Sequence, residues 1–369
     1  MSYILRISLK GSYHVIGRNS GHEDPYYYSM PSFERLSNGD WTVCARQVRT
    51  LTDPKGRIKA KRSSDKGKTW IDMTAPTCHD ETEFPQNGHL MCHITEIRPN
   101  ELIAVYVMIY TDEGSPLFHP VTDGMQEACV RITHSHDNGE TWEKPKDIDY
   151  RIDDLLIPGK PLKLPDGSMG IPCETHDIWD RGYKQPVTAK FVRSINGGST
   201  FDEGFDIASH PYLLYGDARP MHYEDKIWMY FWTYNTRDKK DENVHRAFSD
   251  DFGRSWSVPE PVGLSTQITS PALIKDDVIM AVTQDRFSGS PGIKAMLSYD
   301  GGIDFDRSSA CMIFKAASVP DGQNPFAQFE QFKFGYSTVT AIKGNSFAVC
   351  YWHDNGMSTS VSVSIVEIV

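Results

Sequence analysis

The sequence repeats the stretch Ser135-His136-Asp137-Asn138-Gly139-Glu140-Thr141-Trp142, with small changes, so that five copies occur in 369 residues. The consensus is S-x-D/N-x-G-x-T/S-W/F, and each of its parts favours a tight turn. An Asp or Asn side chain bonds nearby backbone N–H groups, a glycine accepts a positive φ, and the aromatic ring anchors the turn. The other copies are residues 63–70 (SSDKGKTW), 194–201 (SINGGSTF), 249–256 (SDDFGRSW) and 298–305 (SYDGGIDF).

The copies are predicted to be the turns of β-hairpins, because an apolar or alternating run precedes most of them. They recur every roughly 50–70 residues, close to the length of one four-stranded propeller blade with its loops. A second repeat, out of phase with the first, predicts six further hairpins that read strand, turn, strand. These inner hairpins span residues 28–45, 89–107, 160–173, 219–232, 270–282 and 336–352.

We call each copy of the repeated eight-residue stretch a box. Six inner hairpins and five box turns predict an all-β protein, a six-bladed β-propeller built as one domain over residues 1–369. The missing outer hairpin is expected to form from the two ends of the chain. Residues 3–10 and 358–369 both read as strands, and their pairing would close the ring and remove exposed sheet edges. A β-sandwich that carries incidental boxes is the alternative, and five copies in one chain favour the propeller.

Composition limits the function. The net charge is −11 and there is no run of basic residues, which argues against nucleic acid and anionic membranes as partners. No stretch approaches the ~20 apolar residues of a membrane span, and the first residues lack a signal-peptide core. We therefore expect a cytoplasmic protein, or one whose leader has been removed. The seven cysteines include no C-x-x-C pair, so we expect thiols in a reducing compartment, no metal and no cofactor.

The hairpin geometry predicts where a binding site lies. The first strand of each inner hairpin leaves one face of the ring and the second strand returns to it. Strand starts and second-strand ends therefore line the same mouth, whereas the box turns belong to the outer hairpins. The densest polar group on this mouth is residues 173–180, which include Glu174, His176 and Asp177. We interpret it as a general base beside an aromatic platform for a sugar, because the spacing is not a recognised metal-ligand set.

Arginines from several blades are candidates for binding an anion. Arg219 and Arg286, with Arg46 or Arg49, would surround the mouth with guanidinium groups, which suit bidentate capture of a carboxylate. The alternative is that each arginine pairs with a neighbouring aspartate and is structural. Gln284, on the fifth hairpin, and Gln331, upstream of the sixth, are further candidate binding residues.

Box turns together with these inner hairpins resemble the sialidase (neuraminidase) superfamily, the proteins with bacterial-neuraminidase repeats. Tyr336-Ser337, in the segment GYSTV, resembles the stretch that holds the family's nucleophilic tyrosine. Residues 45–53 resemble the stretch that carries an arginine and the acid/base aspartate, here Asp53. The resemblance implies that Glu174 deprotonates the tyrosine and that arginines hold a sugar carboxylate.

The sequence departs from this pattern at the start of the first inner strand. Sialidases place there, two residues before a proline, one of three arginines that clamp the carboxylate of sialic acid. The corresponding residues here are Ser29-Met30-Pro31, so the clamp lacks one arm unless Arg46 or Arg49 replaces it. A relative that acts on another sugar is therefore favoured over a true sialidase.

Three functions follow from these residues. The first is a retaining exo-glycosidase that hydrolyses a terminal acidic or polar sugar with Tyr336 as nucleophile. The second is a polysaccharide lyase, in which the tyrosine abstracts the proton beside a uronate carboxylate. The third is a propeller that binds glycans or proteins without catalysis. The sequence leaves the sugar, its linkage and the oligomeric state open.

Overall fold

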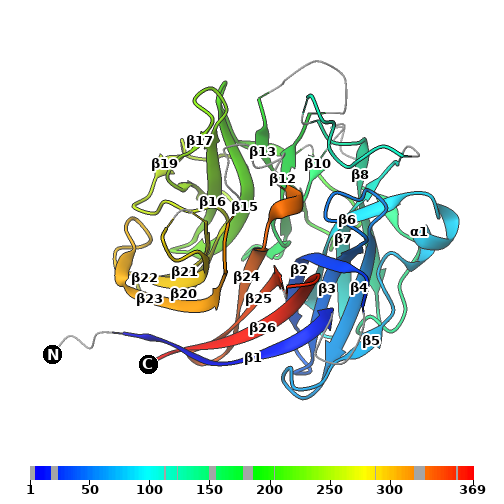
Figure 1. Ribbon diagram of the computed structural model, residues 1–369, viewed down its shortest axis with the longest axis horizontal. Helices are drawn as coiled ribbons and strands as arrows, with labels where there is room; N and C mark the ends of the chain where they lie inside the picture. The colour runs from blue at the N-terminus through cyan, green and yellow to red at the C-terminus, as the bar shows by residue number, and fades with distance from the viewer. Residues whose placement is uncertain are drawn as a thin grey trace.

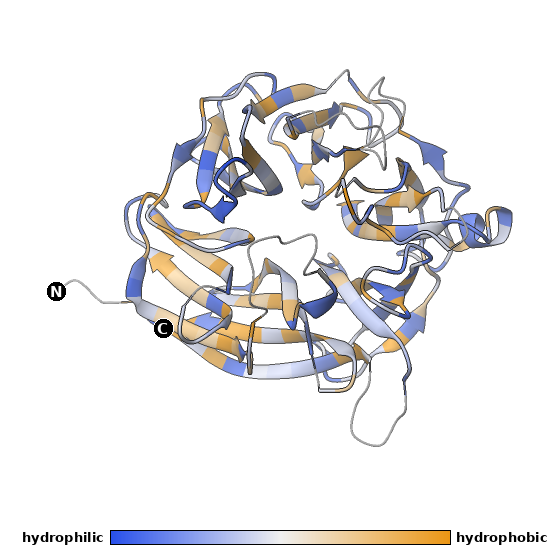
Figure 2. Cartoon of the chain, turned by 45° about the horizontal axis from the view of Figure 1, so that its top comes forward, coloured by the Kyte–Doolittle hydropathy of each residue, from blue (hydrophilic) through white to orange (hydrophobic). Residues whose placement is uncertain are grey.

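The computed structural model describes residues 5–17, 24–111, 114–122, 124–148, 155–177, 186–202, 204–286, 288–319, 329–354 and 356–369. These residues form six antiparallel β-sheets arranged around a common axis (Figure 1). Seen from a tilted direction, the sheets form a ring, with apolar residues along the strands and polar residues in the outer turns (Figure 2). The predicted six-bladed propeller is confirmed.

The first three blades run from the axis outward in chain order. Their elements, with the short helix between blades one and two, are β2 (Tyr27–Arg35), β3 (Trp41–Val48), β4 (Arg57–Ser63), β5 (Ile71–Met73), α1 (Cys78–Glu83), β6 (Gly88–Arg98), β7 (Glu101–Ile109), β8 (Ala128–Ser135), β9 (Lys146–Asp147), β10 (Leu155–Leu156), β11 (Leu162–Lys163), β12 (Met169–Thr175), β13 (Thr188–Ser194) and β14 (Phe205–Ser209). In blade three the innermost position is shared, since β10 and β11 both pair with β12.

The last three blades repeat this order, and blade six takes its outer strand from the N-terminus. Their elements are β15 (Leu213–Tyr223), β16 (Lys226–Asn235), β17 (Lys240–Asp241), β18 (His245–Ser249), β19 (Glu260–Pro261), β20 (Thr269–Lys275), β21 (Val278–Asp285), β22 (Gly292–Ser298), β23 (Asp306–Lys315), η1 (Phe329–Gln331), β24 (Phe334–Lys343), β25 (Ser346–Asp354), β26 (Thr359–Ile368) and β1 (Ile7–Gly17).

The ring closes where the two ends of the chain pair. β1 lies antiparallel to β26, with Ile7 opposite Ile368 and Gly17 opposite Ser360 (Figure 1). The predicted pairing of the ends is therefore present, although the N-terminal strand extends further along the chain than residues 3–10. Residues 3 and 4 lie outside the described residues.

Each of the five boxes connects the third and fourth strands of its blade, in one repeated geometry. In the clearest copy the Gly139 N–H donates to Ser135 Oγ (2.7 Å) and the Thr141 N–H donates to Asp137 Oδ1 (2.9 Å). The corresponding two bonds occur in the other four copies. Because these bonds join residues four apart, the eight-residue pattern specifies the turn locally.

The box glycine also lets neighbouring blades pack together. Gly253 has φ +87°, in the left-handed region, and a Cβ there would lie 2.3 Å from the Phe191 ring of the preceding blade. Phe191 is fully buried against Ala189, Phe231 and other apolar residues of blades three and four. The same glycine therefore serves the turn and the contact between blades.

We expect Asp137→Ala to lower the free energy of unfolding by about 1 kcal/mol, since it removes the side chain that closes the turn. Burial alone would raise the pKa of Asp137, but hydrogen bonds from Thr141 and Ser135 hold it at about 2. The difference in unfolding free energy between the parent and the variant should be largest above about pH 4 and should vanish as the pH falls towards 2. Urea unfolding between pH 2 and 7 measures this.

His136→Ala changes an exposed side chain of the same turn and is the control. It should alter stability by less than about 0.5 kcal/mol. An Asp137→Ala protein as stable as the parent would contradict a structural purpose for the boxes.

Candidate functional site

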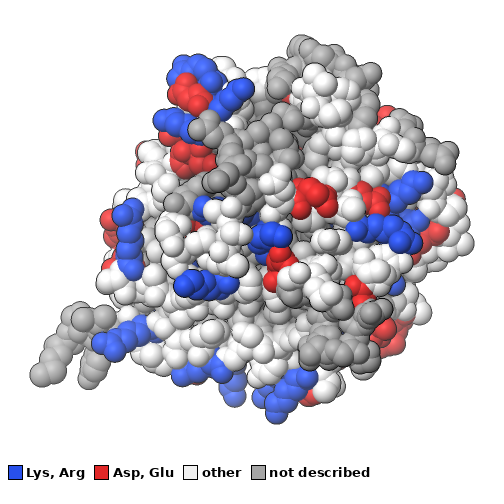
Figure 3. All heavy atoms as spheres, viewed as in Figure 1, with Lys and Arg blue, Asp and Glu red and all other residues white. Residues whose placement is uncertain are grey.

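A cavity of about 980 Å³ lies where the inner hairpins converge. Its wall is formed mainly by first-strand starts and second-strand ends, as the hairpin geometry predicts. The charged, amide and imidazole groups in this wall are Glu174, His176, Asp177, His210, Asp217, Lys239, Gln267, Gln284 and Arg286. Its aromatic groups are Phe118, Tyr212, Trp232, Tyr234, Phe332, Tyr336 and Trp352. Acidic and basic side chains also lie next to each other near the middle of the face drawn in Figure 3.

Three first strands carry the same backbone irregularity where they reach the cavity. β2, β15 and β24 each contain a register shift, and within it Met30, Asp217 and Tyr336 have φ values of 50°, 53° and 50°. A positive φ is unusual for these residue types and costs roughly 1–3 kcal/mol at each position. All three residues line the cavity, so the bulges direct the side chains of three blades towards one space.

Tyr336 lies deep in the ring. Its hydroxyl donates to the carbonyl oxygen of Pro158 (2.7 Å), and the Arg219 guanidinium lies 4.6 Å from the centre of its ring. The ring of His93 stacks near the tyrosine, with 6.4 Å between centroids. Burial raises the pKa of Tyr336 above its ordinary value, the Arg219 charge opposes this, and Asp217 and Glu174 add to it. The phenol is therefore neutral until a base takes its proton.

Glu174 and Asp217 form a pair of carboxyl groups from blades three and four. The backbone N–H of Asp217 donates to Glu174 Oε2 (2.8 Å). Burial, and then the Asp217 charge, raise the pKa of Glu174 to about 8. Burial also raises the pKa of Asp217, but Arg219 and Arg286 oppose that rise. Two ionised carboxylates are therefore unfavourable in this pair, and the raised pKa of Glu174 favours its protonated form.

The two arginines of the site are held by protein groups. Arg219 donates to the Pro158 carbonyl oxygen, and its Nη2 lies 3.9 Å from Asp217 Oδ1. Arg286 donates to Gln267 Oε1 and to the Phe334 carbonyl oxygen. Both guanidinium groups also act on the Asp217 charge. The alternative considered for Arg219, an ion pair with its neighbouring aspartate, is therefore the contact that the structure contains.

Besides Arg219, four predicted site residues do not line this cavity. Arg46 is 0% exposed, and its guanidinium donates to the carbonyl oxygens of His89, Leu51 and Asp53. It therefore fixes its own loop and does not replace the missing clamp arm. Asp53 accepts the Lys55 N–H (2.9 Å) in that loop. Arg49 is exposed and lies over Tyr26, and Gln331 is exposed at the end of η1.

Six predicted residues line the cavity directly, and Arg219 lies behind the Tyr336 ring. The six, on blades three, five and six, are Tyr336, Glu174, His176, Asp177, Gln284 and Arg286. His176 Nδ1 contacts the Asp177 carbonyl oxygen (3.1 Å), and burial lowers the pKa of His176 to about 4. Residues 178–180 of the same predicted polar group lie outside the described residues.

Sequence reasoning missed Asp217 as a member of the site and considered it only as a partner of Arg219. A signal was present, because Ser29-Met30, Gly216-Asp217 and Gly335-Tyr336 all place a small residue before the bulge residue. The described residues contain no cluster of three or more His, Cys, Asp or Glu side chains placed to hold a metal ion. No described helix is long and apolar enough to cross a membrane.

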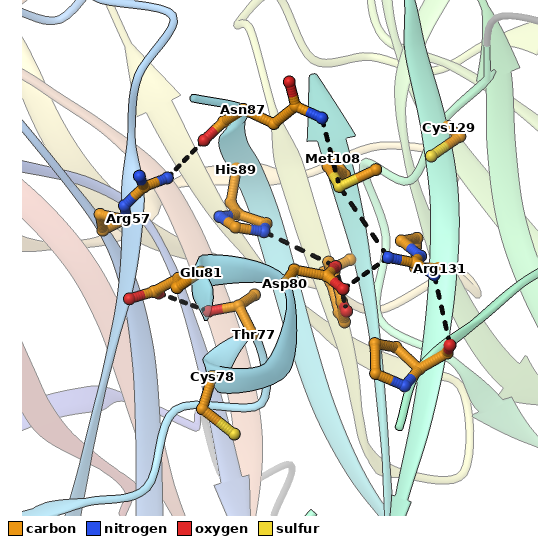
Figure 4. Close-up of polar contacts among 12 residues, drawn as sticks. Arg57, Thr77, Cys78, Asp80, Glu81, Asn87, His89, Met108, Cys129 and Arg131 are labelled. Carbon is orange, nitrogen blue, oxygen red and sulfur yellow. Dashed lines mark hydrogen bonds and ion pairs between the residues drawn. The ribbon is translucent and has the colours of Figure 1, made fainter. Parts of the chain in front are cut away.

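A second polar cluster lies beneath α1, outside the cavity (Figure 4). Asp80 is 1% exposed and accepts hydrogen bonds from Arg131 Nη1 (2.5 Å) and the Tyr106 hydroxyl (2.7 Å). His89 Nε2 lies 3.8 Å from the same carboxylate. Arg131 also bonds Asp147 Oδ1 (2.8 Å) at the surface. The cluster joins α1 to the strands of blade two, and we interpret it as structural.

The chain was compared with known proteins. No protein-family model matches it. A curated protein described as a sialidase, from Bacteroides fragilis (strain YCH46), is 22% identical over 395 residues, covering 98% of this chain and 67% of that protein. A protein of unknown function from Dyadobacter fermentans has a similar structure, with a TM-score of 0.73, 14% identity and coverage of 98% and 99%.

Two solved sialidases are also similar in structure. The Hadza microbial sialidase Hz136 has a TM-score of 0.69, with 16% identity, over 92% of this chain and 66% of that chain. The Trypanosoma rangeli sialidase in complex with sialic acid has a TM-score of 0.62, with 14% identity, over 96% and 57%. This chain thus spans about two thirds or less of the length of these sialidases. The comparisons confirm the predicted resemblance to the sialidase superfamily and its propeller fold.

We expect Asp80→Ala to lower the free energy of unfolding by about 3–5 kcal/mol, because it removes the buried partner of the Arg131 charge and leaves only the exposed Asp147. Asp147→Ala removes the exposed partner of the same arginine and should cost less than about 1 kcal/mol. Denaturant unfolding of both variants tests the comparison. Equal losses in the two variants would show that burial does not decide the strength of this network.

Proposed function

We propose that the protein is a sialidase-like glycoside hydrolase that removes a terminal sugar from a glycan, with Tyr336 as the nucleophile. The similarity to sialidases supports this reaction class. A cavity of about 980 Å³ that is lined by aromatic rings and carboxyl groups suits the end of a glycan chain.

One observation carries the proposal. Tyr336, Glu174 and Asp217 come from blades six, three and four and line the same cavity, where the Asp217 N–H donates to Glu174 Oε2 (2.8 Å). Hydrolysis by a phenol nucleophile needs a base for the phenol proton and an acid for the departing oxygen. Two carboxyl groups that line the same cavity as Tyr336, one of them with a raised pKa, are the candidates for these two roles.

The roles follow from the surroundings of each carboxyl group. Arg219 and Arg286 favour the ionised form of Asp217, so we assign it as the base, which accepts the phenol proton once the hydroxyl leaves the Pro158 carbonyl oxygen. The Tyr336 oxygen then bonds the anomeric carbon, the glycosidic bond breaks, and Glu174 gives its proton to the departing oxygen. In the second step water gives a proton to Glu174 and its oxygen to the sugar. The tyrosyl bond breaks, and Asp217 returns the proton to Tyr336.

This assignment changes two roles that the family resemblance implied. Asp53 lies in the loop that Arg46 fixes and does not line the cavity, so the acid must come from another residue. Glu174 has the raised pKa that suits a general acid at neutral pH, and Asp217 therefore takes the place of the base.

We expect Tyr336→Phe to reduce kcat by about 10²-fold or more, because it removes the nucleophile and keeps the ring that stacks on Arg219. Tyr351→Phe is the matched control, since it removes a buried hydroxyl that bonds Ser364 Oγ (3.1 Å) within blade six. The control should lose about 1 kcal/mol of stability and keep its activity. Reducing-sugar release from a panel of glycosides and uronate polymers measures the loss. A product that absorbs as an unsaturated uronate would instead establish a lyase.

The pH dependence tests the role of Glu174. A general acid is active while protonated, so kcat should fall as the pH rises through about 8. Glu174→Gln should abolish this fall and slow the release of alkyl alcohols far more than that of nitrophenol, which departs without a proton. Activity that rises through about pH 8 would show that Glu174 acts as the base.

A further inference from the structure

The hydroxyl of Tyr336 is held by a backbone carbonyl group of blade three. It donates to the Pro158 carbonyl oxygen (2.7 Å), and Met91 Sδ is a second, weaker acceptor at 3.4 Å. Arg219 Nη1 donates to the same carbonyl oxygen. One carbonyl oxygen, with its two lone pairs, thus binds groups from blades six and four. The place of this carbonyl group therefore decides where the phenol oxygen lies.

The carbonyl group belongs to Ile157-Pro158-Gly159, which we call the inner segment. This segment lies between β10 and β11, so it interrupts the innermost strand of blade three. The proline fixes its own φ and keeps Ile157 extended. A Cβ at Gly159 would lie 2.5 Å from the Ala218 carbonyl oxygen of blade four. The glycine therefore permits the close approach that brings the inner segment to the neighbouring blade.

His93, on β6 of blade two, binds the inner segment from the other side of its sequence. It is 1% exposed, with Nε2 2.9 Å from the Ile157 carbonyl oxygen and Nδ1 3.0 Å from Ser32 Oγ. A carbonyl oxygen only accepts, so Nε2 carries the proton and Nδ1 accepts the Ser32 hydroxyl. Burial, and then the Arg219 charge, lower the pKa of His93 to about 3, so the imidazole is neutral at neutral pH. Its two hydrogen bonds fix both the tautomer and the orientation of the ring.

His93 lies beside the proposed nucleophile without facing the substrate. Its ring is stacked near that of Tyr336, with 6.4 Å between centroids and 25° between the planes. Neither His93 nor the inner segment belongs to the described residues that line the cavity. An effect of His93 on the reaction must therefore act through the position of Tyr336.

We propose that His93 is a positioning residue for Tyr336, because its Nε2–H fixes the inner segment whose Pro158 carbonyl oxygen holds the phenol. The proposal rests on the proposed function, in which Tyr336 is the nucleophile. A nucleophile held in one orientation reacts faster than a mobile one, and a misplacement of about 1 Å can cost about 10²-fold in rate. His93 would thus contribute to turnover from outside the cavity.

The first experiment measures the position of the phenol without turnover. We incorporate 3-fluorotyrosine in place of Tyr336, which keeps the hydroxyl, and record the fluorine NMR spectrum. His93→Leu removes the N–H donor, so the signal should shift and broaden relative to the parent. His93→Gln should keep the parent spectrum, because a glutamine amide nitrogen has about the reach of imidazole Nε2. A spectrum that His93→Leu leaves unchanged would overturn the proposal.

The second experiment separates kcat from KM on the glycoside that the parent protein hydrolyses. His93→Leu should lower kcat by about ten-fold or more, because the nucleophile is misplaced. KM should stay within about two-fold of the parent value, because the side chain does not line the cavity. His93→Gln should restore most of the lost kcat. Equal losses in the two variants, or a loss confined to KM, would contradict positioning by the Nε2–H.

His89→Leu is the matched control for the leucine substitution. His89 is on the same strand, is 0% exposed and does not belong to the cavity lining. This control should change neither kcat nor the fluorine spectrum. If His93→Leu does not fold, Ser32→Ala removes only the hydroxyl that donates to Nδ1. It should shift the fluorine signal and lower kcat at constant KM, and a variant identical to the parent would overturn the proposal.

The two experiments distinguish this proposal from the proposed function. A changed fluorine spectrum with unchanged kcat would show that His93 positions the phenol and that the phenol is not the nucleophile. The proposed function would then fail, whereas the positioning of Tyr336 by His93 would stand. An unchanged spectrum would reject the positioning, whatever the activity of the variant.

Discussion

The antiparallel pairing of β1 with β26 is the interaction on which the rest of the ring depends. It gives blade six its outer strand and fixes blade one beside the end of the chain. Thr359 Oγ1 reinforces this contact, since it donates to the Tyr28 carbonyl oxygen (2.6 Å) and accepts the Tyr28 N–H (2.7 Å). Tyr28 lies two residues before Met30, so the same contact places one side of the cavity. Without this pairing, β26 would be left as an exposed edge.

A closed ring explains how strained residues persist at the centre. The positive φ values at Met30, Asp217 and Tyr336 are unfavourable by themselves. Each residue lies in a strand that pairs with its neighbour both before and after the register shift. The sheets hold these bulges because the strands continue on both sides of them. Strain of this kind, repeated on three blades, is the means by which distant parts of the chain are aimed at one cavity.

The fold was predictable from the sequence because its signals are local. In the box, Ser135 and Asp137 bond backbone groups four residues away. The eight-residue pattern therefore specifies the turn through contacts within the box itself. The site was less predictable because its contacts are not local. Arg46 resembles a ligand-binding arginine in sequence, but its partners include the His89 carbonyl oxygen of the next blade. Nothing within residues 45–53 shows that contact.

The arginines illustrate why a family pattern does not transfer directly to a substrate. A guanidinium binds whichever acceptors surround it, and here Arg286 meets a glutamine oxygen and a carbonyl oxygen while Arg219 meets Asp217. Once a carboxylate of the protein occupies that place, the arginine becomes its counter-ion and opposes the rise in pKa that burial causes. The two arginines thereby favour the form of Asp217 that a base requires. The same two residues that would clamp an acidic sugar in one setting thus support proton transfer in another.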